Sequence, residues 1–441
     1  MLIRSLARQE TLYAVNSEKL LLPASNMKVV TLAAAAERLG WDFSYETKLV
    51  AVGPVEAGWL DGDLVVVGTG DPSLDDWDGA ATRLFQTLAE QVKASGIRAI
   101  AGRVVGDDNH FDDGMPGSGW AWDDLDKSFA TVVGALQFNE NTARLVVTPG
   151  IEGAAPSVEV IPEGSGLAVR NRLITRAGDG SVSITTRRRI GSPEIELTGS
   201  VPPGAGSIAR NASVFNPTLY LVTALRNALA ANGIEVRGVA ADIDDLTDAP
   251  DAVAGVVVAS YRSPPLSALA QTMMKNSQNL FAETLVNTIG AVDRPAAGST
   301  AEAGLAGVRS LLRGWDVPES ALTVADGSGL SRYNLATPAA LVAVLAHVFA
   351  DGRLRASFQA ALPVAGQDGT LAQRLKGTAA EGNARAKTGA FSNVRALSGY
   401  VGTADDEPLA FSIIANNYGT ASDLVERITD AIVARLAAFR R

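Results

Sequence analysis

The sequence predicts an α+β fold, with an early α/β segment, a β-rich stretch that interrupts it and a helix-rich last part that ends in an antiparallel sheet. Helical periodicity dominates after residue 256 and gives way to three short strands in succession, which is typical of helices packed on an antiparallel sheet. A helix followed by a strand occurs twice earlier in the chain. Between its two copies lies a stretch rich in Gly, Pro, Ser, Val and Thr with the alternation of strands.

The composition supports a sizeable core and excludes several kinds of chemistry. Of the 441 residues, 47 % are hydrophobic and 20 % are charged, and about 150 residues per domain predicts about three domains. The net charge of −10 argues against nucleic acid as the main partner. Cysteine is absent, and His110 and His347, the only two histidines, stand in no metal-ligand spacing. We therefore expect no metal, no cofactor and a general base other than histidine.

The first part of the chain predicts a hairpin over residues 2–15, a helix over 25–39 that ends at Gly40, and strands over 47–53 and 64–67. Apolar runs are shorter than the ~18 residues that cross a membrane, so we expect no transmembrane segment. The N-terminal residues also lack the apolar region of a signal peptide.

The repeated pattern consists of a helix, a Gly-Ile pair and a strand that ends in Asp. The first copy spans residues 82–107 and the second spans 218–242. Turns from helix to strand often use Gly and a buried Ile, so the echo can arise without a common origin. Alternatively, both copies belong to one mixed α/β domain that the β-rich residues 145–206 interrupt. The α/β domain would then comprise residues 47–144 and 207–256, with a β-rich domain at 145–206 nested within it.

The last part predicts helices within 265–289, 301–315 and 338–350, strands over 384–391, 395–401 and 409–415, and a final helix over 420–439. The histidine at 347 falls in an apolar helical stretch, where we expect a packed side chain.

Ser25 and Lys28 are the first candidates for catalysis. Residues three apart on a helix lie on the same face, so Lys28 can reach the Ser25 hydroxyl. The positive end of the helix dipole disfavours a second charge, and burial lowers the pKa of lysine from about 10.4. A neutral Lys28 could then take the Ser25 proton. One Ser-x-x-Lys is expected by chance in a chain of this length, so the spacing alone is weak.

Two further polar motifs follow in the chain. Ser277-Gln-Asn279 precedes a helix and by itself is typical of a polar helix start. Lys387-Thr388-Gly389 lies on a predicted strand, where Gly389 would let the backbone approach a ligand and the two side chains before it would bind a carboxylate; alternatively, it is an exposed strand segment before a bulge.

The three motifs in this order resemble those of penicillin-binding proteins and β-lactamases. More specifically, the chain resembles the D-Ala-D-Ala carboxypeptidase/endopeptidase family of class C, low-molecular-mass penicillin-binding proteins (peptidase family S13). The resemblance rests on Pro23-Ala-Ser-Asn-Met-Lys28, Asn276-Ser-Gln-Asn-Leu280, Asp326-Gly-Ser-Gly-Leu-Ser-Arg-Tyr-Asn334, Gly366-Gln-Asp-Gly-Thr-Leu371 and Ala386-Lys-Thr-Gly389. It implies a discontinuous α+β domain of the penicillin-binding transpeptidase/β-lactamase-like fold at 1–46 with 257–441, into which two smaller domains are inserted, at 47–144 with 207–256 and at 145–206.

By this resemblance, Ser25 is the acylated nucleophile and Lys28 its base, while Ser277 and Asn279 relay protons and hold the substrate amide. Lys387 and Thr388 would orient the terminal carboxylate. The oxyanion would lie between the N–H groups of Ser25 and Ala390. The residues matching the family's diaminopimelate site are Asp124, Phe129 and Arg332. Peptidoglycan stem peptides are the implied substrate, and β-lactams the implied inhibitors.

The sequence departs from the family at two points. Ala390 stands where Thr or Ser usually follows Lys-Thr-Gly, which removes a hydroxyl from the carboxylate site and predicts weaker substrate binding, by ~1.5 to 3 kcal/mol for a bond to a charged group. Ser25 also lies close to the N-terminus, whereas relatives are exported and carry further residues before it. We therefore expect a truncated start and a periplasmic or otherwise extracytoplasmic location.

A serine D-Ala-D-Ala carboxypeptidase or DD-endopeptidase is the leading hypothesis, and the motifs do not distinguish these two preferences. A β-lactamase, esterase or D-aminopeptidase on the same fold is an alternative, which fast turnover of penicillin would favour. A non-catalytic cell-wall-binding protein is a second alternative, which Ala390 and the unusual start would suit.

Overall fold

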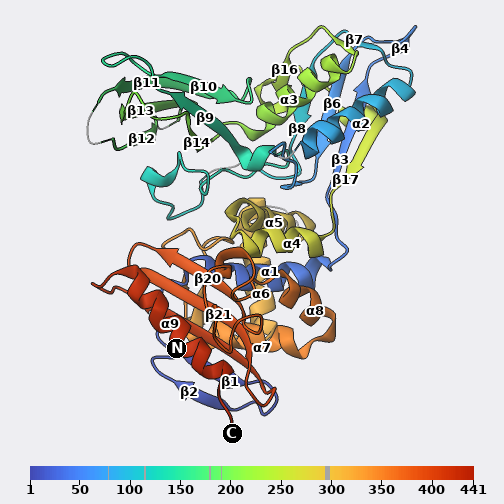
Figure 1. Cartoon of the computed structure of the whole chain (residues 1–441). Helices are drawn as coiled ribbons and strands as arrows, with labels where there is room; N and C mark the ends of the chain where they lie inside the picture. The colour runs from blue at the N-terminus through green and yellow to red at the C-terminus, as the bar shows by residue number, and fades with distance from the viewer. Residues whose placement is uncertain (78, 114–115, 178–179, 190, 294–297) are drawn as a thin grey trace. The chain divides into compact units, whose positions relative to one another are not determined.

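A computed structural model describes residues 1–77, 79–113, 116–177, 180–189, 191–293 and 298–441 (Figure 1). The chain separates into two compact units. The first comprises Met1–Ser44, Gly117–Trp120 and Pro264–Arg441, and the second comprises Tyr45–Pro116 and Ala121–Ser263. The second unit begins and ends near the limits predicted at 46 and 257. The few residues of difference arise because β17 (Val256–Arg262) pairs with β3 (Glu46–Val52) in a sheet of the second unit.

The first unit is built on a five-stranded antiparallel sheet with the order β2-β1-β22-β21-β20. Its strands are β1 (Leu2–Ser5), β2 (Thr11–Ala14), β20 (Arg385–Phe391), β21 (Val394–Gly402) and β22 (Pro408–Asn416). The final helix α9 (Ser422–Ala437) packs on β21, and α7 (Pro338–Ala350) packs on the opposite face (Figure 1). The predicted α+β class with helices on an antiparallel sheet is thereby confirmed.

Helix α1 (Met27–Leu39) forms the centre of this unit, and a short 3₁₀ turn (Ala24–Asn26) leads into it. Its first ten residues are buried, because its Val, Leu and Ala side chains are apolar on every face. It contacts the helices α4 (Leu266–Lys275), α5 (Asn279–Asp293), α6 (Thr300–Gly314), α7 and α8 (Gly352–Ala361). The predicted helix over 25–39, with Gly40 at its end, is confirmed apart from its first turn.

The helical stretch 265–289 consists of α4 and α5, and α5 begins at the polar Ser277–Asn279 segment, where a helix start was expected. The positive φ of Ser277, +58°, turns the chain between the two helices. Helix α8 was not expected, because its sequence is largely polar and only Leu354, Phe358 and Ala361 are buried. In the described part of the chain, no helix is both long and apolar enough to cross a bilayer.

The second unit contains the repeated helix–strand pattern. Its helices are α2 (Ala80–Ala94) and α3 (Pro217–Ala231), and its strands after each helix are β7 (Ala99–Ile100) with β8 (Val104–Asp107), and β15 (Glu235–Val236) with β16 (Ala240–Asp242). β7 pairs in parallel with β15, and β8 pairs in parallel with β16. The two copies therefore build the same pair of sheets, as the interrupted-domain interpretation requires.

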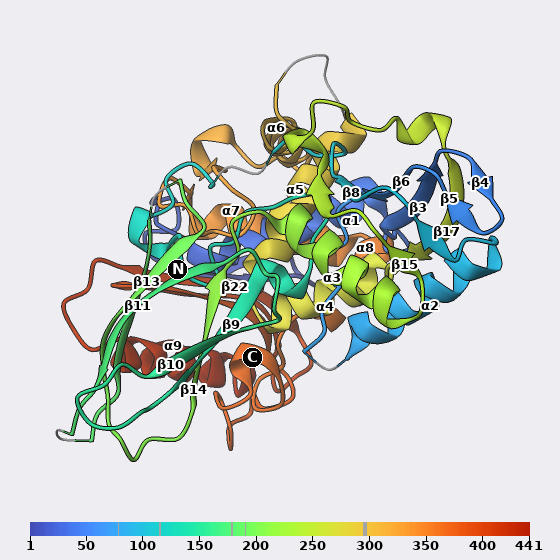
Figure 2. The same ribbon diagram turned by 90° about the horizontal axis from the view of Figure 1, so that it is seen from above.

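The interruption between the copies folds as two facing sheets (Figure 2). One has the order β10-β9-β14, formed by β10 (Ser157–Ile161), β9 (Thr142–Thr148) and β14 (Ile208–Ser213). The other has the order β11-β13-β12, formed by β11 (Ala168–Thr175), β13 (Glu194–Val201) and β12 (Ser183–Arg188). Leu145 and Val147 of the first sheet share one apolar core with Leu173, Ile195 and Leu197 of the second.

Candidate active site

Ser25 and Lys28 come together at the N-terminus of the central helix α1. Ser25 lies in the 3₁₀ turn, and the Lys28 Nζ atom is 3.1 Å from its Oγ atom. Ala24, just before the serine, has a φ of +48°, a backbone conformation that L-residues rarely adopt. Strain of this kind at a reactive side chain is typical of functional sites.

The contacts of Lys28 define what its amine can do. Nζ lies 2.6 Å from Asn279 Oδ1, 2.8 Å from Ser328 O and 3.1 Å from Ser25 Oγ. The two carbonyl oxygens only accept hydrogen bonds. A neutral amine has two N–H groups and one lone pair, so both N–H groups go to the carbonyls and the lone pair is left for the Ser25 hydroxyl. The arrangement suits a base that removes the Ser25 proton.

The surroundings of Lys28 favour this neutral form. The side chain is fully buried, and loss of hydration lowers its pKa to about 7, although the carboxylates of Glu283 and Asp326 act in the opposite direction. An amine that titrates near neutral pH can both accept and return a proton. This environment replaces the histidine that the site does not have.

Ser277 and Asn279 form the second wall of the site. Asn279 is the first residue of α5 and contacts Lys28 directly. Ser277 lies two residues earlier, in the turn whose positive φ separates α4 from α5. A continuous helix through this point would have placed the two residues on different faces, so the break is what allows both to belong to one site.

Strand β20 forms the third wall, at the end of the sheet order and in contact with the 3₁₀ turn Ala24–Asn26. A Cβ atom added at Gly389 would lie 2.6 Å from Pro23 O and 3.2 Å from Ser25 N, so a side chain would collide with the backbone of the nucleophile. Gly389 therefore allows β20 to approach Ser25. The sequence predicts that the three motifs form one site. The Lys28–Asn279 hydrogen bond and the approach of Gly389 to Ser25 bring the three motifs together.

Lys387 is buried, which rules out the exposed strand position considered above. Its Nζ atom donates to Thr388 O at 3.0 Å. Burial and repulsion from the charge of Lys28 hold its pKa well below the usual range of lysine. A substrate carboxylate beside Lys387 would restore a counter-charge and favour its protonated form.

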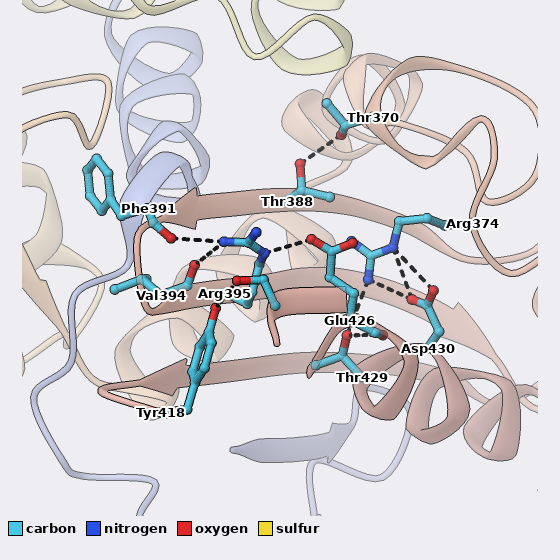
Figure 3. A network of polar contacts seen from close by, with 11 residues as sticks. Thr370, Arg374, Thr388, Phe391, Val394, Arg395, Tyr418, Glu426, Thr429 and Asp430 are labelled. Carbon is cyan, nitrogen blue, oxygen red and sulfur yellow. Dashed lines mark hydrogen bonds and ion pairs between the residues drawn. The ribbon is translucent and has the colours of Figure 1, made fainter. Parts of the chain in front are cut away.

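Thr388 and Ala390 flank Gly389 on the same strand. Thr388 Oγ1 bonds Thr370 Oγ1 at 2.8 Å, which fixes the predicted Gly-Thr-Leu motif beside β20 (Figure 3). Ala390 is exposed at the rim. Opposite Ala390 on β21, Arg395 donates to the carbonyls of Phe391 and Val394, both at 2.9 Å, and to Glu426 of α9 at 2.6 Å (Figure 3). Arg395 and, through it, α9 thus hold in place the end of β20 that carries Ala390.

The loop 326–334 completes the surroundings of Lys28 and contains groups that the motifs alone did not identify. The buried Glu283 accepts hydrogen bonds from the N–H groups of Gly327 at 3.0 Å and Ser328 at 2.7 Å. Asp326 accepts from Gly329 N, Asn334 Nδ2 and Trp120 Nε1 at 2.6 to 2.9 Å. The four-residue spacing from Asn279 to Glu283, one helical turn, could have indicated that they share a face.

The predicted diaminopimelate residues fall in different units. Arg332 is exposed in the first unit, and its guanidinium carbon lies 5.0 Å from the centre of the Phe391 ring. Asp124 and Phe129 belong to the second unit, where Asp124 ends a 3₁₀ turn (Trp122–Asp124) and Phe129 is exposed. Their role next to Arg332 stays a prediction.

One group of carboxylates could in principle hold a cation. Asp108, Asp113 and Asp244 place oxygen atoms within 4.8 Å of one another in the second unit. Burial and the neighbouring charge of Asp113 raise the pKa of Asp244 to about 6, as expected for acids crowded together. They belong to a different unit from Ser25, and the chemistry described above does not use them.

The sequence and the fold of the whole chain were compared with those of known proteins. The sequence profile of the D-Ala-D-Ala carboxypeptidase 3 (S13) family aligns with residues 1–439. The D-alanyl-D-alanine carboxypeptidase of an Actinomadura species is 36 % identical over 98 % of this chain and 80 % of its own length. Crystal structures of penicillin-binding protein 4 (DacB) from Haemophilus influenzae superpose with TM-scores of 0.86 at 26 % identity and, in a β-lactam complex, 0.80 at 25 % identity; both alignments cover 99 % of this chain and 96 % of theirs.

Proposed function

The chain belongs to the D-Ala-D-Ala carboxypeptidase 3 (S13) family and is a serine-type carboxypeptidase of the penicillin-binding class, and we propose that it works through an acyl-enzyme on Ser25. The observation that carries this proposal is the set of contacts around Lys28, which leaves the lone pair of a neutral amine for the Ser25 hydroxyl. The proposed substrates are peptidoglycan stem peptides that end in D-Ala-D-Ala.

Acylation begins when Lys28 takes the proton of Ser25 and the Oγ atom attacks the carbonyl carbon of the scissile D-Ala-D-Ala bond. The N–H groups of Ser25 and Ala390 stabilise the negative charge that develops on the carbonyl oxygen. The proton passes from Lys28, through Ser277, to the nitrogen of the leaving D-Ala, and the carbon–nitrogen bond breaks. An ester on Ser25 and a free D-Ala result.

Hydrolysis repeats the sequence with water in place of the hydroxyl. Lys28 takes a proton from water, the hydroxide attacks the ester, and the proton returns to Ser25 Oγ as the bond breaks. A β-lactam follows the first half of this route and leaves a stable acyl-enzyme, because its opened ring stays attached. The β-lactam complex of the Haemophilus relative supports this part of the proposal.

Substrate orientation is assigned to β20. Lys387 and Thr388 bind the terminal carboxylate, and the strand itself lies beside the peptide backbone. Ala390 contributes its N–H but no hydroxyl, so we expect weaker carboxylate binding than in relatives with Thr or Ser there. Arg332, with Asp124 and Phe129, is proposed to read the diaminopimelate side chain of the stem peptide. Cleavage of cross-links by the same acylation chemistry is proposed as well.

The location follows from the substrate. Peptidoglycan lies outside the cytoplasmic membrane, so we propose that the enzyme acts in the periplasm or an equivalent extracytoplasmic space. The similarity to penicillin-binding protein 4 supports this location.

The proposal is tested with a fluorescent penicillin and a D-Ala-D-Ala peptide. We expect one penicillin adduct on the peptide containing Ser25, located by mass spectrometry, and release of D-Ala from the peptide. Ser25→Ala should lose both while keeping its circular dichroism spectrum. Fast turnover of penicillin without a stable adduct would indicate a β-lactamase instead. An adduct elsewhere, or D-Ala release by Ser25→Ala, would overturn the proposal.

A further inference from the structure

The carboxylate of Glu283 faces the backbone of the loop behind Lys28. Each of its oxygens accepts one hydrogen bond from the backbone, Oε2 from Gly327 N at 3.0 Å and Oε1 from Ser328 N at 2.7 Å. The side chain is 9 % exposed, and it also forms a hydrogen bond with the side chain of Ser328. A buried carboxylate held by two consecutive N–H groups fixes the orientation of the peptide between them.

The Ser328 carbonyl belongs to the next peptide, whose N–H at Gly329 donates to Asp326 Oδ1 at 2.8 Å. Glu283 therefore fixes the chain on the N-terminal side of this carbonyl, and Asp326 fixes it on the C-terminal side. The carbonyl oxygen of Ser328 accepts from Lys28 Nζ at 2.8 Å, and the preceding carbonyl of Gly327 accepts from Thr31 Oγ1 at 2.6 Å. Glu283 is also one helical turn after Asn279, the other carbonyl acceptor of Lys28. One face of α5 thus supplies the first acceptor directly and fixes the second through the loop.

We propose that Glu283 is a positioning residue for the acylation reaction: by holding the 327–328 backbone, it keeps the Ser328 carbonyl on one N–H of Lys28 and so directs the lone pair of Lys28 to Ser25. This inference rests on the function proposed above and extends it to a residue that touches neither Ser25 nor the substrate. Asp326 supports the same carbonyl from the other side, because it accepts from Gly329 N, the N–H of the peptide that faces Lys28.

Glu283 is one member of a buried set of charges. The groups that influence Lys28 are Glu283, Asp326 and Lys387, and Lys28, Lys387 and Asp326 are at most 2 % exposed. The acylation rate falls at low pH, and this part of the pH–rate profile is called the acid limb. Its position therefore depends on the titration of the coupled set and not of a single residue. Burial raises the pKa of Glu283 to about 7, so Glu283 titrates in the same pH range as Lys28. Because the charged form of Glu283 favours the protonated amine, removing that charge should move the limb to lower pH.

The substitution Glu283→Gln separates the two effects. An amide keeps the shape but presents one NH₂ group, which would face one of the two N–H groups of the loop. We expect the plateau rate of acylation by penicillin to fall by about ten- to a hundredfold, the range typical when the support of a catalytic ligand is removed. The acid limb should move to lower pH. Glu283→Asp keeps the charge on a shorter side chain, so its plateau should fall while its limb stays near that of the wild type.

The matched control is Glu302→Gln, the same change at an exposed position of α6, which should leave both quantities unchanged. Rates are normalised to the fraction of protein that penicillin labels, so partial unfolding does not imitate the effect. If Glu283→Gln does not fold, Glu283→Asp decides: wild-type plateau and limb would overturn the inference. An unchanged pH profile of folded Glu283→Gln would do the same. A wild-type protein that penicillin does not acylate would instead refute the proposed function.

Discussion

At the scale of single residues, Lys28 differs from an ordinary lysine in the hydrogen-bond acceptors that surround its amine. Two carbonyl oxygens take its N–H groups, and burial lowers its pKa to about 7. An ordinary surface lysine, protonated near neutral pH and hydrated, could not act as a base. The chemistry therefore depends on the surroundings of the amine as much as on its distance from Ser25.

The pH dependence of acylation follows from this residue. Only neutral Lys28 accepts a proton, so the rate should fall about tenfold for each pH unit below the pKa and level off above about 7. The second-order rate constant for labelling by penicillin, measured from pH 5 to 9, checks this expectation. A rate that still rises steeply between pH 8 and 9 would mean that Lys28 keeps an ordinary pKa.

Gly389 offers a second test at this scale. In Gly389→Ala the new Cβ would lie 2.6 Å from Pro23 O and 2.8 Å from Asn26 Nδ2, so β20 must move away from Ser25. We expect the acylation rate to fall roughly a hundredfold, the usual cost of displacing reacting groups by about 1 Å. Gly314→Ala, at the end of α6 with nothing within 4 Å of the new atom, is the control. Equal rates for both variants would contradict the assigned approach of β20.

Side-chain identity predicted much at this scale, but it did not predict everything. Ser25, Lys28 and Asn279 were found because their types and spacings are unusual in combination. Glu283 was not, since its importance lies in two backbone N–H groups and one carbonyl, which carry no sequence identity of their own. Such contacts become visible only once the loop is folded.

At the scale of elements, periodicity identified helices and strands better than the breaks between them. Helix α7 begins and ends where predicted, because Thr337 caps it and Pro338 occupies its first turn. The start of a helix after the polar Ser277-Gln-Asn279 segment was predicted, but the positive φ of Ser277 was not, since a serine does not require that conformation. Tertiary contacts of Asn279 and Glu283 favour the new direction of α5 over continued helix at that point.

The turn between β20 and β21 provides the test for this scale. Arg395→Met removes hydrogen bonds to Phe391 O, Val394 O and Glu426. We expect a loss of about 1–3 kcal/mol in the free energy of unfolding, measured by urea denaturation, because two partly buried carbonyls lose their donor. Acylation should slow as well, since Ala390 lies opposite Arg395.

The control for this test is Arg427→Met on α9. Arg427 pairs with Asp423 at the surface, where both side chains are about two-thirds exposed, so we expect a loss below about 0.5 kcal/mol. Similar losses for the two variants would show that the contacts of Arg395 are no more important than a surface ion pair.

At the scale of the whole molecule, the chain leaves the first unit after Ser44 and returns for good at Pro264, and each unit has its own apolar core. The family resemblance predicted this discontinuity, because the long segment between Ser25 and Ser277 fits the two insertions of the family, and the repeated helix–strand pattern agreed with it. The sequence could not predict the return of Gly117–Trp120 to the first unit, because those four residues dock through single contacts such as the Trp120–Asp326 hydrogen bond.

Separate cores predict separate unfolding. We expect two transitions in differential scanning calorimetry, because proteins with several cores commonly depart from two-state behaviour. Acylation by penicillin should raise the midpoint of one transition, that of the unit containing Ser25, and leave the other unchanged. A single transition that shifts as a whole would contradict this independence.

The pairing of β1 with β22 joins the first few residues of the chain to some of its last. During synthesis on the ribosome, Ser25 emerges early, whereas β20, β21 and β22 are made after more than three hundred further residues. The nascent protein therefore carries its nucleophile for most of its production without a sheet to hold it or a buried amine to activate it. Reactivity arises only when the newest strands close on the oldest one, so an interrupted translation product would be chemically inert.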